Sequence, residues 1–309
     1  MEFIRNVANF LEPEDLRLLR ILMRDDVTSA SITKIFEDPE NAGKYLVLLN
    51  ERPKAVYIVA KIAERIEEYL EGEEASISYE LFIKALDRIK NTENNVLKQK
   101  IHFLVRDAII RKINEKEYEI AAILISEFYD FGLKDCLRKL LLIVSDLAEE
   151  GEYQRAFKTL NLLPHSSITE ELKSHILEEW GKGLMTQGEY INAASRFLEA
   201  IRTGNRKELF TSLGDAYFRA KEFDKAYDAY KSVELSAKNE VDVLRRISML
   251  LNFWGEELVN EGEYEKAVDK FNEAYQTAVK INDDEIAVNA LKSAKRAIEM
   301  AKSNQSNLV

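Results

Sequence analysis

A short phrase recurs four times in the second half of this chain. It consists of an aromatic residue, an alanine three positions later and a large apolar residue four positions after the alanine, and Gly-Glu precedes three of the four copies. The aromatic residues are Tyr153, Tyr190, Phe223 and Tyr264, spaced by 37, 33 and 41 residues. The extra residues of the longest spacing, at 236–241, are expected to lengthen the helices or the connecting loop. Recurrence at a period of roughly 34 residues indicates a stacked array of helical units, each of which buries its apolar face against its neighbours.

The residues before three of the copies predict how the two helices of a unit pack. Large side chains recur there at offsets of three and four, which places them on one face of a helix. They are Leu177, Trp180 and Leu184, then Phe210, Leu213 and Tyr217, and then Leu251, Trp254 and Leu258. A glycine interrupts each set, at Gly181, Gly214 and Gly255. Because a glycine inside a helix costs roughly 0.5–1 kcal/mol relative to alanine, we expect a second helix to approach closely at these three positions.

This register resembles that of the tetratricopeptide repeat (TPR) family. The match covers three units, at about 174–206, 207–239 and 248–281, and a looser unit at 137–170. A more degenerate unit around 102–136 keeps only Tyr118 and Ala121. The resemblance implies an all-α fold, in the form of a right-handed superhelical solenoid of antiparallel helix pairs.

The domain organisation follows from the same register. We expect an N-terminal helical region at 1–95, formed either by divergent repeats or by a capping domain, and a degenerate repeat at 96–136. TPR-like repeats follow at 137–282, and a C-terminal capping helix is expected at 283–303. In that helix the apolar residues, among them Ala290, Leu291, Ala294 and Ile298, are expected to pack on the preceding pair while Lys292 and Lys295 face water.

Composition supports this class of fold. The chain has 11 Gly and 4 Pro in 309 residues, and this scarcity of helix breakers favours nearly continuous helix. The formal net charge of −11 weighs against non-specific binding to a phosphate backbone. Residues 1–6 lack the apolar run of a signal peptide, and Cys136 is the single cysteine, so we expect a protein of the reducing cytoplasm.

Residues 1–100 also read as helices, with candidates at 14–23, 31–36, 42–49, 54–70 and 79–90, and the acidic stretch 71–74 is expected to be a loop or a boundary. The helices at 16–23, 31–36 and 42–49 are spaced like a helix-turn-helix, which leaves a nucleic-acid-binding regulator as an alternative. The third of them is mostly apolar and carries one lysine, Lys44, whereas a recognition helix needs several polar side chains directed at bases.

No pattern for catalysis or for a cofactor stands out. The three histidines, His102, His165 and His175, have no partners at metal-ligand spacing, and the sequence contains no phosphate-binding glycine loop and no nucleophile motif. Cys136 lies among leucines and is expected to be a core residue. We therefore expect no enzymatic activity, no metal and no cofactor.

The resemblance implies that the first helix of each unit lines a concave groove that holds a segment of a partner protein. Core register predicts which side chains of these helices are exposed, and five acids (Glu178, Glu179, Glu208, Asp215 and Glu256) outnumber two bases (Lys182 and Arg219) among them. We expect a basic or apolar partner segment and a non-catalytic scaffold or adaptor; homo-oligomers and a self-assembling structural protein stay open. The predicted partner-binding residues are Glu178, Glu179, Lys182, Asp215, Phe218, Arg219, Met249, Asn252, Phe253 and Glu256.

Overall fold

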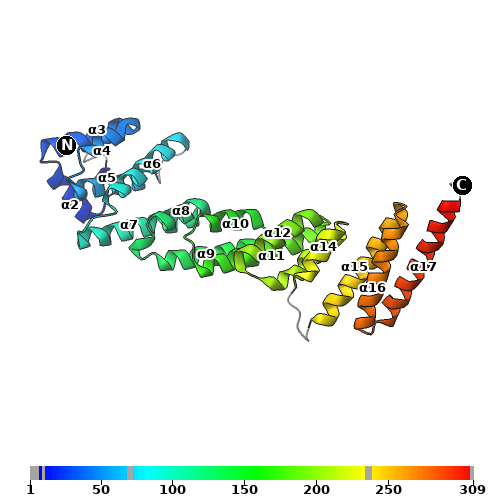
Figure 1. Ribbon diagram of the computed structural model, residues 1–309. Helices are drawn as coiled ribbons and strands as arrows, with labels where there is room; N and C mark the ends of the chain where they lie inside the picture. The colour runs from blue at the N-terminus through cyan, green and yellow to red at the C-terminus, as the bar shows by residue number, and fades with distance from the viewer. Residues whose placement is uncertain (1–6, 9–10, 68–71, 234–238, 307–309) are drawn as a thin grey trace. The chain divides into compact units, whose positions relative to one another are not determined.

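The computed structural model describes residues 7–8, 11–67, 72–233 and 239–306, and every regular element within these ranges is a helix (Figure 1). The prediction of an all-α fold is confirmed. The chain divides into two compact units: unit 1 comprises residues 1–142 and 162–164, and unit 2 comprises residues 143–161 and 165–309. The right-handed superhelical path and the domain boundaries at 95, 136 and 282 stay predictions.

Unit 1 contains seven described α-helices and the first part of an eighth. They are α2 (Pro13–Leu22), α3 (Asp26–Glu37), α4 (Ala42–Val47), α5 (Pro53–Glu67), α6 (Gly72–Ile89), α7 (Asn95–Asn114), α8 (Tyr118–Glu127) and the start of α9 (Lys134–Glu149), with the short 3₁₀ turns η2 (Pro39–Asn41) and η3 (Tyr129–Phe131). Helix α3 begins earlier than predicted because the Asp25 carboxylate caps it, accepting the Thr28 N–H at 2.8 Å. Helix α6 begins at Gly72, so the predicted acidic loop is helical from that residue on.

The core of unit 1 surrounds α5. Every residue from Ala55 to Ala63 is buried, as is typical of a helix that is apolar on almost all sides. Helix α6 packs along α5, and α2, α3 and α7 also contact it. The buried Lys112 of α7 donates to the buried Glu67 of α5 at 2.6 Å. Because a buried charge is tolerated only when it is paired, this ion pair fixes where α7 lies on α5.

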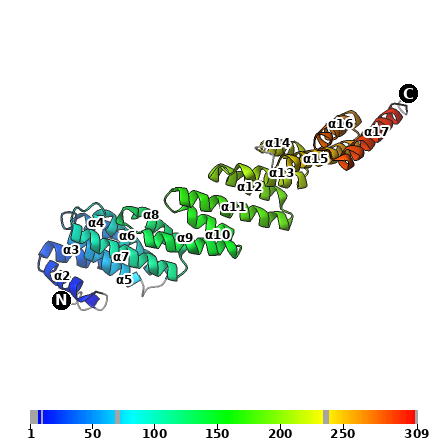
Figure 2. The same ribbon diagram turned by 90° about the horizontal axis from the view of Figure 1, so that it is seen from below.

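Unit 2 consists of antiparallel helix pairs, as the views in Figure 1 and Figure 2 show. Its elements are the end of α9, then α10 (Tyr153–Asn161), α11 (Ser167–Gln187), α12 (Tyr190–Gly204), the 3₁₀ turn η4 (Lys207–Leu209), α13 (Phe210–Arg219), α14 (Phe223–Lys231), α15 (Glu240–Asn260), α16 (Tyr264–Lys280) and α17 (Asp284–Ser306). Contacts run along the chain from each helix to the next, from α10 to α17. Of the residues predicted to lengthen a helix or loop at 236–241, those at 236–238 lie outside the described residues, and α15 begins at Glu240.

The Gly-Glu of the recurring phrase forms the turn between the two helices of a pair. Gly188 ends α11 with a φ of 80°, a left-handed conformation that glycine adopts without steric cost. The Gly188 N–H donates to the Met185 carbonyl at 3.2 Å, and the Glu189 N–H donates to the Leu184 carbonyl at 3.0 Å. These two bonds are those of a Schellman motif. In the third copy, where glycine is absent, Lys221 takes the left-handed conformation with a φ of 62°.

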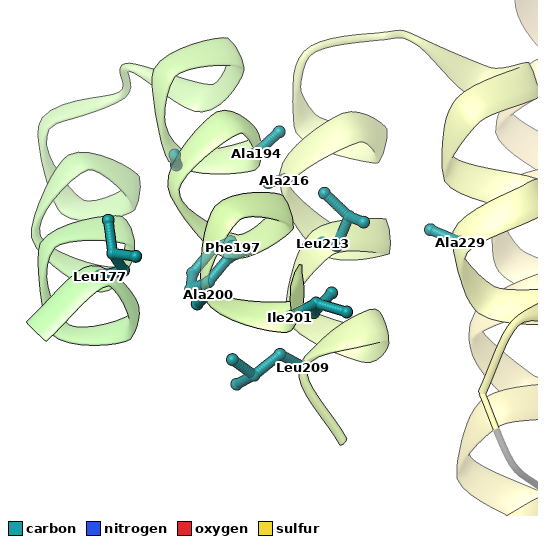
Figure 3. Close-up of a cluster of buried hydrophobic side chains, with 10 residues drawn as sticks. Leu177, Ala194, Phe197, Ala200, Ile201, Leu209, Leu213, Ala216 and Ala229 are labelled. Atoms are coloured by element: carbon teal, nitrogen blue, oxygen red, sulfur yellow. The ribbon is translucent and has the colours of Figure 1, made fainter. Parts of the chain in front are cut away.

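The helix glycines lie where the sequence predicts a close approach. A Cβ atom at Gly181 would lie 2.7 Å from the Phe197 ring, and one at Gly255 would lie 2.6 Å from the Phe271 ring; Gly214 meets the Tyr230 ring in the same way. The aromatic ring of the second helix therefore fills the space that a side chain would take on the first helix. Figure 3 shows the surrounding core, to which α11, α12, α13 and α14 contribute Leu177, Phe197, Leu213 and Ala229.

Hydrogen bonds and ring contacts repeat between two of these units at a separation of 74 residues. The Ser174 hydroxyl donates to the Ala200 carbonyl at 2.8 Å, and the Ser248 hydroxyl donates to the Ala274 carbonyl at 2.7 Å. Arg196 lies 4.0 Å from the centre of the Trp180 ring, and Lys270 lies 4.0 Å from the centre of the Trp254 ring. The unit between them has shorter helices, since α13 spans 10 residues whereas α11 and α15 each span 21.

Helix α17 corrects two details of the predicted cap. Its buried stripe consists of Ala287, Ala290, Ala294 and Ala297, whereas Leu291 and Ile298, predicted to pack inward, are exposed. The helical period places the alanines on the side that faces α16 and turns the two larger residues away from it. Lys292 and Lys295 are exposed as predicted, and the helix, which the sequence predicts to end at residue 303, continues as far as Ser306.

Candidate partner-binding groove

Five of the ten predicted partner-binding residues line one cavity of about 790 Å³ in unit 2: Asp215, Phe218, Arg219, Met249 and Phe253. Helices α13 and α15 form most of its wall, with Met185 from α11 and Phe223 and Tyr230 from α14. We call it the first cavity. Its volume lies within the range of protein ligand sites, roughly 300–1,000 Å³.

A second cavity of about 580 Å³ lies on the other side of α15 and is lined by Asn252 and Glu256, two more of the predicted residues. It shares Arg245, Met249 and Phe253 with the first cavity, and α17 and the residue before it supply Asp283, Glu285, Ile286, Asn289 and Ser293. Met249 and Phe253 thus form a ridge with a cavity on each side. We call the two cavities and this ridge the groove.

Glu178, Glu179 and Lys182 line neither cavity. The Glu178 carboxylate is mostly buried and pairs with Lys182 at 2.7 Å and with Arg206 at 2.6 Å, and Lys182 also pairs with Glu179 at 2.8 Å. The register of α11 predicts that Glu178 is exposed, but Arg206, which follows α12, covers it. A contact of this kind cannot be derived from the register of one helix. The ion pairs of Glu178 tie α11 to the segment after α12.

The ridge is apolar and uncovered. The side chains of Met249 and Phe253 are 42% and 53% exposed, respectively. The Phe253 ring is centred 5.4 Å from the Phe218 ring, which in turn lies 6.4 Å from the Phe223 ring. Phe253 therefore packs against the half-buried Phe218 while about half of its own surface stays exposed. Rigid aromatic side chains with an exposed face are common anchors in protein interfaces.

An ion-pair cluster lies at one end of the first cavity. Arg246 donates to both carboxylate oxygens of Asp215 at 2.7 Å, and the Tyr230 hydroxyl donates to Asp215 at 2.5 Å. Burial and the hydrogen bond to Asp215 raise the pKa of Tyr230. For Arg246, burial acts to lower the pKa, but the hydrogen bonds to Asp242 and Asp215 outweigh it and raise the pKa. Asp215 is thus half-buried with its carboxylate already satisfied, so it positions α13, α14 and α15 rather than offering a free charge.

Several residues that line the two cavities are not among the ten predicted ones. They are the bases Lys221, Arg245 and Arg246, the acids Asp242, Glu257, Asp283 and Glu285, and the apolar Ile286. The sequence predicts only that a helix starts at 283–285, whereas the position of Asp283 and Glu285 in the second cavity depends on how α17 packs beside α15. Nothing in the helical register of single units indicates which neighbouring helices share a cavity.

These additions change the charge expected of the groove. The first cavity has three acids (Asp215, Asp242 and Glu257) and four bases (Arg219, Lys221, Arg245 and Arg246), so the predicted excess of acids does not extend to it. Arg219 is the base among them that makes no ion pair with the described residues. The second cavity keeps an acidic character, with Glu256, Asp283 and Glu285 against Arg245 alone.

The described residues contain no group of three or more His, Cys, Asp or Glu side chains that could hold a metal ion. Cys136 is buried, as predicted for a core residue, and burial raises the pKa of its thiol to about 11. Within the described part of the chain, no helix has both the length and the apolar character that crossing a membrane requires. Residues 1–6, on which the prediction about a signal peptide rests, lie outside the described residues.

Neither a family model nor a curated protein sequence matches the chain. Solved structures similar to it include the following three. The MamA structure (MamA MSR-1 C2) has a TM-score of 0.27 and 17% identity, covering 52% of this chain and 97% of its own. The complex of the TPR2AB domain of yeast Sti1 with pHSP90 has a TM-score of 0.28 and 14% identity, covering 88% of this chain and 97% of its own. A circular tandem repeat protein with a novel repeat topology has a TM-score of 0.34 and 12% identity, covering 90% of this chain and 88% of its own.

The packing within unit 2 shows the helical repeats directly. Three glycine–aromatic contacts and the left-handed turns occur at the positions that the repeat register predicts. The helix pairs of unit 2 therefore pack as the resemblance of the sequence to TPR repeats predicts. The groove lies over α13 and α15, which are the first helices of their pairs, and over α17, which follows the last pair.

Proposed function

We propose that unit 2 is a non-catalytic scaffold that binds a segment of a partner protein in the groove. The observation that carries this proposal is the uncovered apolar ridge of Met249 and Phe253 between two cavities. An exposed phenylalanine held by a second ring costs little side-chain entropy to order on binding, so it suits an anchoring role.

The charges of the second cavity suggest the chemistry of the partner segment. Glu256 and Glu285 are exposed, and Glu285 makes no ion pair with the described residues. A segment that places an apolar side chain on Phe253 could set a lysine or arginine beside these two acids. Asn252 adds a polar side chain to the wall of the same cavity. The proposed partner is therefore an apolar segment with a basic residue next to it.

The ten predicted residues take different parts in this proposal. Phe218, Met249 and Phe253 supply apolar contact, Asn252 and Glu256 supply polar contact, and Arg219 stands at the edge of the first cavity. Asp215 positions the helices through its bonds to Arg246 and Tyr230. Glu178, Glu179 and Lys182 extend the same face of α11 outside the cavities and would contact only a longer segment.

The test is a comparison of retained proteins between purified wild type and variants used as bait in host lysate. We expect Phe253→Ala combined with Met249→Ala to lose the partner that wild type retains. Phe103→Ala is the matched control, since Phe103 is 60% exposed but belongs to unit 1. Equal melting temperatures of the three proteins would show that the fold is intact.

Charge is tested separately. We expect Glu256→Lys combined with Glu285→Lys to weaken retention of the same partner, whereas Glu265→Lys, at an exposed position on α16 outside both cavities, should leave it unchanged. If both groove variants retain the same proteins as wild type, the groove is not the binding site and the proposal fails.

A further inference from the structure

Unit 1 contains a cavity of about 340 Å³ that the predicted function does not use. It lies among α2, α5 and the start of α7, and its lining includes Arg17, Leu18, Ile21, Lys54, Tyr57 and Val96. Contacts of α5 with both α2 and α7 hold these helices together. The volume lies at the low end of ligand sites, roughly 300–1,000 Å³, which suits one or two side chains of a peptide.

The base of this cavity is fixed by buried polar contacts. Tyr57 is buried, and its hydroxyl donates to the buried Asp15 carboxylate at 3.3 Å. Lys100 donates to the other oxygen of Asp15 at 2.9 Å and pairs with Glu14 at 3.1 Å. Its ammonium group also lies 5.5 Å from the centre of the Tyr57 ring. These hydrogen bonds and ion pairs connect α2, α5 and α7 at this point, so they hold the residues at the base of the cavity in place.

The rim combines free positive charge with exposed apolar surface. Arg17 and Lys54 are exposed and make no ion pair with the described residues. Ile21 and Val96, which also line the cavity, are 55% and 66% exposed. In a chain of net charge −11, two unpaired cations at one small cavity are a local reversal of the overall charge.

From this geometry we propose that the cavity of unit 1 binds an acidic peptide segment of a partner protein, with one large apolar side chain inserted against Tyr57 and Leu18. Arg17 and Lys54 pair with carboxylates that flank the apolar residue. A peptide fits better than a small carboxylate, because Ile21 and Val96 extend the apolar contact beyond the cavity. The positive rim, in contrast with the acidic second cavity of unit 2, gives the two units opposite charge preferences.

The test is methyl NMR on the full chain, titrated with the blocked peptide Asp-Glu-Leu-Phe-Glu-Asp. We expect saturable shifts of the methyl groups of Leu18, Ile21 and Val96. The combined variant Arg17→Glu and Lys54→Glu should raise Kd by about tenfold or more. The matched control is Arg20→Glu with Lys98→Glu, which makes the same charge change at exposed positions on α2 and α7 outside the cavity. Its Kd should stay within about twofold of wild type.

Two control peptides separate charge from apolar contact. The peptide with lysine in place of each acid and the peptide with serine in place of Leu-Phe should both bind more weakly than the parent peptide. The proposal is overturned if the three methyl groups do not shift, if the control variant weakens binding as much as the cavity variant, or if the lysine peptide binds equally well. Shifts at these methyl groups that grow with protein concentration in the absence of peptide would instead identify a second copy of the chain as the occupant and would also overturn it.

Discussion

Gly181 and Gly183 lie two residues apart on α11 and have opposite surroundings. A Cβ atom at Gly181 would lie 2.7, 2.9 and 3.0 Å from three carbons of the Phe197 ring, and real Cβ atoms essentially never show the two shorter distances. At Gly183 the nearest atom, on the Tyr153 ring, would be 3.5 Å away, which is ordinary contact. The repeat register singles out Gly181 and does not include Gly183, and the structure gives the physical reason for the distinction.

Gly181→Ala should therefore destabilise the protein and Gly183→Ala should not. Overpacking of this kind costs typically about 1–3 kcal/mol, which exceeds the roughly 0.5–1 kcal/mol that alanine contributes to a helix. At Gly183 an alanine side chain has room, so only its stronger helix preference acts, and that variant should be as stable as wild type or more stable. Urea denaturation followed by circular dichroism measures both changes. Two variants of equal stability would show that Phe197 moves aside without cost and that the glycine is not required for packing.

At the scale of the helical element, Glu178 joins α11 to the segment after α12. Burial acts to raise its pKa, but hydrogen bonds from Lys182 and Arg206 favour the carboxylate and hold the pKa below its ordinary value of 4.5. A carboxyl group with a lower pKa in the folded chain contributes stability above its unfolded pKa and loses that contribution as the pH falls through the folded value. This link between elements should thus weaken in acid.

We expect Glu178→Gln to cost on the order of 1 kcal/mol at neutral pH. The difference from wild type should shrink as the pH falls below 4.5, because the wild-type carboxyl group then becomes neutral as well. Glu179→Gln is the control, since Glu179 is exposed and pairs only with Lys182. Thermal unfolding at a series of pH values measures the effect. A difference between Glu178→Gln and wild type that is constant over that series would contradict the ion-pair explanation.

The lengths of the helices also differ between units, and the first cavity lies beside the shortest of the first helices. Helix α13 is about 16 Å shorter than α11 and α15 at roughly 1.5 Å per residue, and the first cavity lies against it. The sequence predicts three similar units and anticipates extra length only near residues 236–241. It does not indicate that the middle pair is the short one, because the positions that define the register lie in the shared central part of each helix.

At the scale of the whole molecule, the two units offer separate sites with different charge. The proposed peptide cavity lies in unit 1 and the proposed groove lies in unit 2, and no lining residue is shared. Substitutions at sites without common partners usually have additive effects. Neither site should therefore depend on the residues of the other.

Phe253→Ala should leave the Kd of the acidic peptide within about twofold of wild type, and the combined Arg17→Glu and Lys54→Glu variant should retain the partner of the groove. Peptide titration and the lysate comparison, each carried out on both variants, check the two halves of this expectation. If either variant impairs both kinds of binding, the units do not act independently and one of the two sites has been misplaced.

The sequence by itself determined the helix pairs, the glycine–aromatic contacts within them and the turns between them. These features depend on residues less than one repeat apart, whose spacing on a helix is set by its period of 3.6. Only the tertiary structure decided which side chains share a cavity. The pairing of Arg246 with Asp215, the covering of Glu178 by Arg206 and the position of Glu285 beside α15 all join residues from different helices. Such contacts, between two helices or between a helix and a connecting segment, depend on the lengths of helices and on how each pair packs against the next. The register of a single unit carries no information on either.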